Sequence, residues 1–242
     1  MAIIVPGVRV RMTHLYLIRH GDATTTSPNP LEDPHLTTLG VAQAERLRDR
    51  LAATREIKAD VLISSTMLRA RQTAEIIAPA LALPVLYDDD VQEWRFPADE
   101  SLNVDEYIEQ FKSIPHDQKP FFQVMPGAES WVQFMLRACT ALNRITRQYE
   151  ERTIVIVCHG GVVDASFHYF LRLSTLHLPP TYFATHNTSI THWYRVTSEE
   201  SGYPLPAWTL ERYNDIMHLL DLHSTTRIPW RDLDSQTTEH NL

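Results

Sequence analysis

The chain has 242 residues, of which 43% are hydrophobic, and this is enough to bury the core of one ordinary α/β domain. Its 22 basic and 30 acidic residues give a net charge of −8, which argues against nucleic acid or an anionic membrane as the partner. The two cysteines, Cys139 and Cys158, provide no disulfide framework and suit a reducing compartment.

The first residues do not have the pattern of a secretory signal. Residues 1–11 lack a basic region before their apolar residues, and Pro6-Gly7 interrupts the short apolar run. No stretch of the chain is apolar for long enough to span a bilayer. We therefore expect a cytoplasmic protein without a membrane partner. Residues 1–11 are either a loose extension or the product of an uncertain start site, and the sequence leaves both open.

Short apolar runs alternate with segments of helical spacing along the chain. The apolar runs predict strands at Leu15–Ile18, Val61–Ile63, Val85–Tyr87 and Thr153–Cys158. Helical spacing predicts helices over 38–53, 67–81 and 131–149. Two further strands, 189–196 and 208–213, suit an antiparallel edge. This alternation predicts a three-layer α/β/α fold with a mainly parallel, doubly wound sheet.

The whole chain, 1–242, is expected to form a single domain with one insertion. Residues 96–127 contain four prolines around one predicted helix, Val104–Lys112, and are interpreted as a cap-like segment over one end of the sheet. The polar tail, 224–242, is interpreted as peripheral. The aromatic residues in and next to the insertion either line a specificity pocket or form its own small core; they are Trp94, Phe96, Phe111, Phe121 and Phe122.

Two of the predicted strands end in a histidine followed by glycine. The first strand runs into Arg19-His20-Gly21, and the strand Thr153–Cys158 runs into His159-Gly160. Ligands of parallel sheets bind at the carboxyl ends of the strands, where both histidines are expected. A glycine at such a point lets the backbone turn sharply and approach a ligand closely. Two strand ends of the same pattern favour a functional site over two structural histidines.

Two more strand ends carry charged residues. Arg69 falls in the first turn of a helix that follows a strand, where its guanidinium and the helix amides could grip a phosphate. Arg71 and Glu75 on the same helix are expected to form a solvated ion pair. Glu93 follows the third strand and the acidic run Asp88–Asp90, and its neighbours Val91 and Trp94 suit a proton donor.

Taken in order, these motifs resemble the histidine phosphatase superfamily, which has a phosphoglycerate mutase-like fold. The resemblance covers roughly residues 13–189 and depends on six stretches in sequence. They are RHG at Arg19, LTTLGVAQAERL at Leu36, SSTMLRARQTAE at Ser64, the glutamate after the third strand, PGAES at Pro126 and VCHGG at Val157. NTSIT at Asn187 falls at the end of the same series.

The resemblance implies a phosphatase that hydrolyses a phosphomonoester or phosphohistidine without a metal or cofactor. His20 would attack phosphorus and become phosphohistidine, and Glu93 would protonate the leaving oxygen and then activate water. Arg19, Arg69 and His159 would hold the phosphoryl oxygens. Gly21, Asn29 and Gly160 are secondary candidates. The partner would be a phosphorylated small molecule or a phosphoprotein; whether the chain forms a homodimer is left open.

Several alternatives compete with the phosphatase interpretation. A phosphoglycerate mutase-type phosphotransferase is disfavoured because RHG continues as DATTTSPNP, without the longer mutase signature. A metal hydrolase would use His20, Asp22, Glu93 and His159, but Arg19 would oppose the cation. A cysteine phosphatase is dismissed because Asp164 stands where an arginine is needed after Cys158. A catalytically silent member that binds a partner through the same site remains as the rival from another class.

Overall fold

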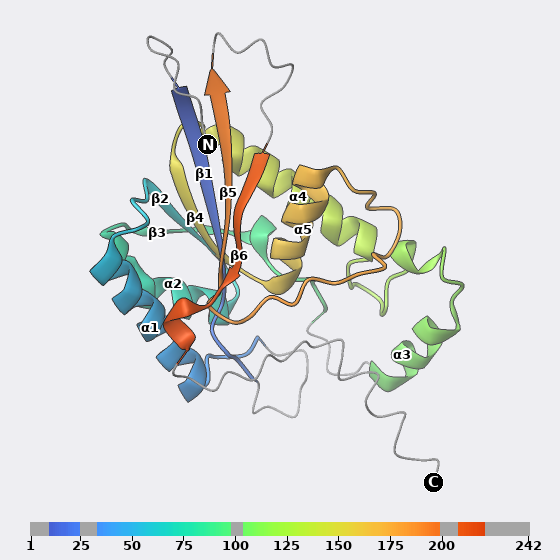
Figure 1. Cartoon of the computed structure of the whole chain (residues 1–242). Coiled ribbons are helices and arrows are strands. Elements are labelled where there is room, and N and C mark those ends of the chain that lie inside the picture. Colours follow the sequence, from blue (N-terminus) through green and yellow to red (C-terminus); the bar gives the residue numbers. More distant parts are fainter. Residues whose placement is uncertain (1–9, 25–32, 98–103, 199–207, 221–242) are drawn as a thin grey trace.

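The computed structural model describes residues 10–24, 33–97, 104–198 and 208–220, which form a sheet flanked by helices (Figure 1). The strands are β1 (Val10–Arg19), β2 (Val61–Ser65), β3 (Val85–Asp88), β4 (Thr153–Cys158), β5 (Ile190–Ser198) and β6 (Trp208–Asp215). They lie in the order β3-β2-β4-β1-β5-β6. The first four strands run parallel, and β5 and β6 add the antiparallel edge. The predicted fold class is therefore confirmed.

The helices lie on both faces of the sheet. They are α1 (Thr38–Thr54), α2 (Leu68–Leu81), α3 (Val104–Ser113), α4 (Trp131–Gln148) and α5 (Gly160–Leu171), with short 3₁₀ helices η1 (Asp89–Val91), η2 (Lys119–Phe121) and η3 (Met217–Leu219). Core residues of α1 and α2 pack on one face, and those of α4 and α5 pack on the other. In the part of the chain that the structure describes, no helix has both the length and the apolar character needed to cross a membrane.

The side chains of β1 alternate between the two faces. Leu15 and Leu17 pack with the α4 and α5 residues, whereas Tyr16 and Ile18 pack with α1 and α2. The strand is longer than the predicted Leu15–Ile18 because its antiparallel pairing with β5 continues to Val10. Residues 10 and 11 thus belong to the sheet rather than to a loose extension, and residues 1–9 lie outside the described residues.

The sequence analysis assigned no helix after His159, yet α5 begins at Gly160. Two adjacent glycines are typical of a turn, and the segment that follows is apolar on nearly every side, so it lacks the polar stripe of a surface helix. Val162, Val163 and Phe167 join the core beside β4. Burial between α4 and the sheet, which only the tertiary structure creates, accounts for this apolar composition.

The aromatic residues in and next to the insertion form two separate groups. The Phe111 ring lies 6.3 Å from that of Phe122, which fits a small local core. The Trp94 ring instead stacks on Phe134 of α4 at 6.1 Å, next to Glu93 in the sequence. Figure 1 shows α3 to one side of the sheet. The cap-like role of 96–127 stays a prediction, and residues 98–103 and the tail, 224–242, lie outside the described residues.

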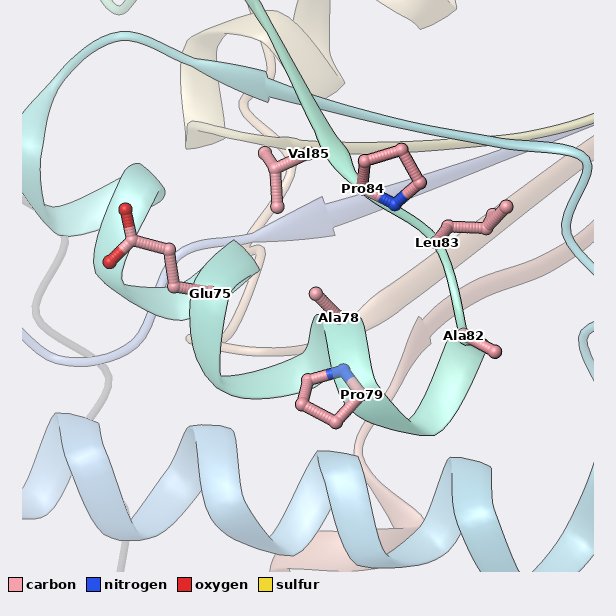
Figure 2. A pocket seen from close by; sticks show the side chains of 7 residues that line it. All are labelled: Glu75, Ala78, Pro79, Ala82, Leu83, Pro84 and Val85. Carbon is pink, nitrogen blue, oxygen red and sulfur yellow. The ribbon is translucent and has the colours of Figure 1, made fainter.

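A shallow apolar depression lies where α2 ends and β3 begins (Figure 2). Its lining consists of Glu75, Ala78, Pro79, Ala82, Leu83, Pro84 and Val85. Because β3 starts at Val85, the depression is at the amino ends of the parallel strands. The histidine-bearing strand ends lie at the opposite edge of the sheet, so the depression is separate from the predicted site.

Candidate active site

The pairing of β1 with β4 brings the two histidine motifs together. The register aligns Arg19 with Cys158, so His20 and His159 leave adjacent parallel strands at the same level. Their ring centroids lie 5.1 Å apart, and both side chains are buried. The parallel register of the two strands thus places both rings at the carboxyl edge of the sheet, where ligands of such sheets bind.

The hydrogen bonds of the His20 ring fix its tautomer. Nδ1 lies 2.7 Å from the carbonyl oxygen of Gly21, and because a carbonyl can only accept, Nδ1 carries the proton. Nε2 therefore keeps a lone pair, and Arg69 Nε donates to it at 3.1 Å. Burial and the charges of Arg69 and Arg19 lower the pKa of His20 well below its ordinary value. The ring is a neutral imidazole with an available Nε2.

Gly21 is required by a close approach of two backbone segments. Its amide donates to Thr73 Oγ1 at 3.0 Å. A Cβ at Gly21 would lie 2.5 Å from the carbonyl oxygen of Gly40, at the start of α1. The glycine after the histidine thus serves packing against α1, in addition to the sharp turn expected from the sequence.

Two guanidinium groups surround the His20 ring. Arg19 is buried at the end of β1, and its NH1 donates to the carbonyl oxygen of Thr185. Arg69 lies in the first turn of α2, with its side chain only 11% exposed. Burial lowers the pKa of both guanidinium groups, and the charge of Glu93 partly offsets this in each. The two guanidinium groups give the site cationic N–H donors next to His20, which suits the binding of an anion.

Asp33 occupies the amide that the sequence analysis had assigned to a phosphate. Its Oδ2 accepts from the Leu68 amide at 2.6 Å, and its Oδ1 accepts from Arg69 NH1 at 3.0 Å. This amide is thus engaged within the protein, and the expectation that the α2 amino terminus grips the ligand stays a prediction. Sequence gave no signal for the contact, because Asp33 is 36 residues away from Arg69.

We predict that Asp33→Asn lowers kcat about tenfold without raising KM. An asparagine oxygen can still cap α2, but the charge-assisted bond that orients Arg69 is lost, and such bonds are worth roughly 1.5–3 kcal/mol. Removing a competing carboxylate also favours binding of an anionic substrate. Steady-state kinetics on an aryl phosphate would check this, with the exposed Asp49→Asn as control. An unchanged kcat in Asp33→Asn would contradict the orienting role.

A serine at the end of β2 holds the second histidine. His159 Nε2 lies 2.8 Å from Ser65 Oγ, which accepts from the Met67 amide at 3.2 Å and can donate its hydroxyl proton to Nε2. Nδ1 of His159 is buried and has no hydrogen-bond partner among the described residues. Burial, followed by the charge of Arg69, lowers the pKa of His159 well below its ordinary value. The ring is thus neutral, with one nitrogen left for a ligand.

Glu93 is fixed by the amino terminus of α5. Its Oε2 accepts from the Gly161 amide at 3.0 Å, and its backbone carbonyl accepts from Arg137 NH2 at 3.1 Å. A side chain at Gly161 would collide with the Glu93 carboxylate and lie 2.8 Å from Phe134, so this glycine makes room for the acid. The second glycine after His159 was not singled out from the sequence.

The loop before β5 supports the Arg19-His20 turn. Asn187 Nδ2 donates to the carbonyl oxygen of His20 at 2.9 Å, and the Thr188 amide donates to that of Arg19 at 2.9 Å. Thr188 adopts φ 53° to do so. Nothing local in the stretch NTSIT predicts this role. Its function as a clamp depends on the antiparallel pairing of β5 with β1.

His218 of η3 extends this clamp. Its Nε2 lies 3.0 Å from Thr188 Oγ1, and its Nδ1 lies 3.5 Å from Arg50 NH1. Arg50 also forms paired hydrogen bonds with Asp215 at 2.9 and 2.7 Å. Burial and the charge of Arg50 lower the pKa of His218 to about 4. Protonating this imidazole would place a positive charge beside the Arg50 guanidinium, and the nearby Asp215 only partly offsets the repulsion.

We predict that the free energy of unfolding falls by about 2 kcal/mol through His218 as the pH drops from 6.5 to 4. The folded-state pKa is depressed, so in this window the unfolded chain binds the proton more readily. The contribution is fully present above pH 6.5 and is lost as the pH approaches 4. Denaturant titrations would show a flatter pH dependence in His218→Gln. The exposed His116→Gln, as control, should keep the wild-type slope.

The structure brings together Arg19, His20, Arg69, Glu93 and His159, with Gly21 and Gly160 at the two strand ends. Asn29, the third secondary candidate, lies outside the described residues. Asp22 is turned away toward α1, where its Oδ2 accepts from Thr37 at 2.7 Å. No group of three or more potential metal ligands gathers anywhere in the described ranges, so the four residues of the metal alternative do not form such a set.

Two smaller predictions need correction. Arg71 and Glu75 do not pair with each other; Glu75 accepts from the Tyr87 hydroxyl at 3.0 Å, and Arg71 lies 5.0 Å from the same ring. The preferred partner, Tyr87, lies on the neighbouring strand β3. The sequence of the helix alone does not reveal this neighbour. Cys158 is fully buried, and burial raises the pKa of its thiol, which agrees with the dismissal of a cysteine nucleophile.

Comparison with known proteins places these features in one family. The family model described as the histidine phosphatase superfamily, branch 1, matches residues 15–215. The chain is 29% identical over 223 residues to a probable phosphoglycerate mutase of Proteus mirabilis, covering 87% of this chain and 97% of that protein. It is 27% identical over 170 residues to a metal-independent phosphoserine phosphatase of Arabidopsis thaliana, covering 66% and 69%.

Solved structures share the fold. A mycobacterial glucosyl-3-phosphoglycerate phosphatase superimposes with a TM-score of 0.64 at 21% identity, covering 85% of this chain and 99% of that one. The phosphoserine phosphatase of Entamoeba histolytica, solved with 3-phosphoglyceric acid, gives a TM-score of 0.62 at 23% identity and covers 86% and 100%. Both share the fold of this chain.

Proposed function

Because the chain belongs to the histidine phosphatase superfamily, we propose that it is a metal-independent phosphatase that hydrolyses a phosphomonoester through phosphohistidine on His20. The observation that carries the proposal is the state of the His20 ring. Its Nδ1 proton is held by the Gly21 carbonyl, and Nε2 keeps its lone pair in surroundings that disfavour protonation. A nucleophilic histidine needs this state to attack phosphorus.

In the first step His20 Nε2 forms a bond to phosphorus while the bond to the ester oxygen breaks. Arg69 Nε, which donates to Nε2 in the free protein, turns to a phosphoryl oxygen. Arg19 takes another oxygen, and the His159 Nδ1, which lacks a protein partner among the described residues, donates to a third. These contacts supply the positioning and positive charge on which phosphoryl transfer chiefly depends.

Glu93 acts on the leaving side. Its carboxyl gives a proton to the departing oxygen, so an alcohol leaves and Glu93 becomes a carboxylate. A water molecule then attacks phosphorus, the bond to Nε2 breaks, and Glu93 takes the water's proton, which restores the starting state. The Gly161 amide and the Arg137 guanidinium hold the acid through both steps.

A phosphoglycerate mutase-type phosphotransferase is the second candidate, because the Proteus mirabilis relative is described as a probable mutase. Both reactions share the phosphohistidine and differ in the acceptor, which is water in one and a second hydroxyl of the substrate in the other. The catalytically silent member that binds through the same site is the third. These alternatives make different predictions for the release of inorganic phosphate.

The test is phosphate release from an aryl phosphate in excess chelator, combined with trapping of the intermediate. We expect turnover in chelator and a phosphoryl group on His20 that is stable in base and labile in acid. Transfer to 3-phosphoglycerate without release of phosphate would favour the mutase. Absence of both turnover and a phosphoenzyme, across a panel of phosphorylated metabolites, would overturn the proposal in favour of the silent module.

A further inference from the structure

A second carboxyl group lies beside the site and has no part in the proposed chemistry. Asp164 belongs to the second turn of α5 and is only 7% exposed. A Cβ at Gly160, four residues earlier, would lie 3.8 Å from Arg19 Nε, and the Gly161 amide, three residues earlier, binds Glu93. Because residues three and four apart share one face of a helix, Asp164 lies on the face of α5 that borders Arg19 and Glu93.

One oxygen of the Asp164 carboxyl finds no partner in the part of the chain that the structure describes. Its Oδ1 is buried and has no hydrogen-bond partner among the described residues. Burial and the nearby charge of Glu93 raise its pKa to about 8, and Arg19 opposes this only in part. The Tyr213 hydroxyl, within electrostatic reach of Asp164, is engaged with Thr185 Oγ1 at 3.3 Å. A buried carboxyl without a partner is costly, and this is the mark of a group that meets a ligand.

The charge of the substrate group that meets Asp164 follows from the side chains around this carboxyl. Arg19, Arg69 and His159 Nδ1, which has no partner among the described residues, already provide donors for the three phosphoryl oxygens. Asp164 is therefore matched to a part of the substrate other than the phosphate. Glu93 marks the side from which the alcohol departs. Asp164, which belongs to α5, lies near Glu93. A cationic N–H donor on the alcohol would satisfy Oδ1 and reduce the repulsion between the two carboxyl groups.

We propose that Asp164 is a specificity-determining residue that binds an ammonium group on the leaving alcohol, so that the preferred substrates are phosphomonoesters of amino alcohols or hydroxyamino acids. The proposal rests on the proposed function, because it assigns Glu93 to the leaving side. Glu93 is held by the Gly161 amide, and Asp164 lies three residues further along α5, so we assign to it an ammonium close to the ester oxygen. Asp164 releases its proton as the ammonium binds, and the two charges then pair.

The experiment compares O-phosphoethanolamine with ethyl phosphate, which differ by the ammonium group. We expect Asp164→Asn to lower kcat/KM for O-phosphoethanolamine by about tenfold or more, mainly through KM, as is typical when a hydrogen bond to a charged group is lost. The kcat/KM of the same variant for ethyl phosphate should stay within about threefold of wild type. The exposed Asp49→Asn serves as the matched control and should leave kcat/KM unchanged for both substrates.

A binding measurement separates failure of this inference from failure of the proposed function. The two compounds would be titrated calorimetrically into His20→Ala, alone and combined with Asp164→Asn. Loss of the ammonium preference on combination would support the role of Asp164 even if turnover were absent. The inference would be overturned if Asp164→Asn weakened binding of both compounds equally, or if it left the ratio of the two affinities unchanged. Either result would leave the proposed phosphatase function intact. Failure of both compounds to bind or react would count against the proposed function itself.

Discussion

Replacement of His20 by alanine is expected to abolish turnover while leaving the fold intact. Loss of a covalent nucleophile typically costs on the order of 10⁴–10⁶ in kcat, because no other group can form the intermediate. The side-chain hydrogen bonds of His20 run to Gly21 and Arg69, and the backbone clamp formed by Asn187 does not use the imidazole. The melting temperature should therefore shift only by a few degrees. Single-turnover assays with an aryl phosphate provide the measurement.

The control for this variant is His116→Ala, which changes an exposed histidine outside the site. It should retain wild-type turnover and phosphoenzyme formation. If His20→Ala kept more than about a hundredth of the wild-type kcat, a level far above what loss of a nucleophile permits, the covalent mechanism would be wrong. In that case water would have to attack phosphorus directly, and His20 would be reduced to a phosphate-binding group.

Replacement of Glu93 by glutamine is expected to give the second-largest effect, and one that depends on the leaving group. A glutamine oxygen can still accept from the Gly161 amide, so the geometry is retained while the transferable proton is lost. General acid catalysis typically contributes 10²–10⁴-fold, and we expect kcat/KM for an alkyl phosphate to fall by about this factor. For p-nitrophenyl phosphate the loss should be much smaller, because its leaving oxygen needs no proton.

The comparison between the two leaving groups decides the role of Glu93. The exposed Glu45→Gln should leave both values unchanged and so controls for the loss of one charge. Equal losses on the alkyl and aryl substrates would mean that Glu93 only binds or orients the substrate. Phosphohistidine should also accumulate in Glu93→Gln, since the same carboxylate is proposed to activate the water of the second step.

Much of the fold could be predicted because burial leaves a local pattern in the chain. The apolar run of β4 and the helical spacing of α4 appear where the structure has them, as do β2 and β3. The prediction failed at α5, because a mostly apolar helix that begins with two glycines shows no clear amphipathic period. It was too short at β1, since pairing with β5 extends a strand beyond its apolar centre.

The amino-acid sequence by itself determined which side chains stand at the ends of the strands, and hence that Arg19, His20 and His159 would share one edge of the sheet. That follows from short-range pattern alone, because parallel strands all present their carboxyl ends on one side. The tertiary structure alone decided the partners of those side chains. Ser65 reaches His159 because β4 lies between β2 and β1, and Asp33 reaches Arg69 across 36 residues. Hydrogen-bond partners of this kind depend on strand order and register, which no local pattern encodes.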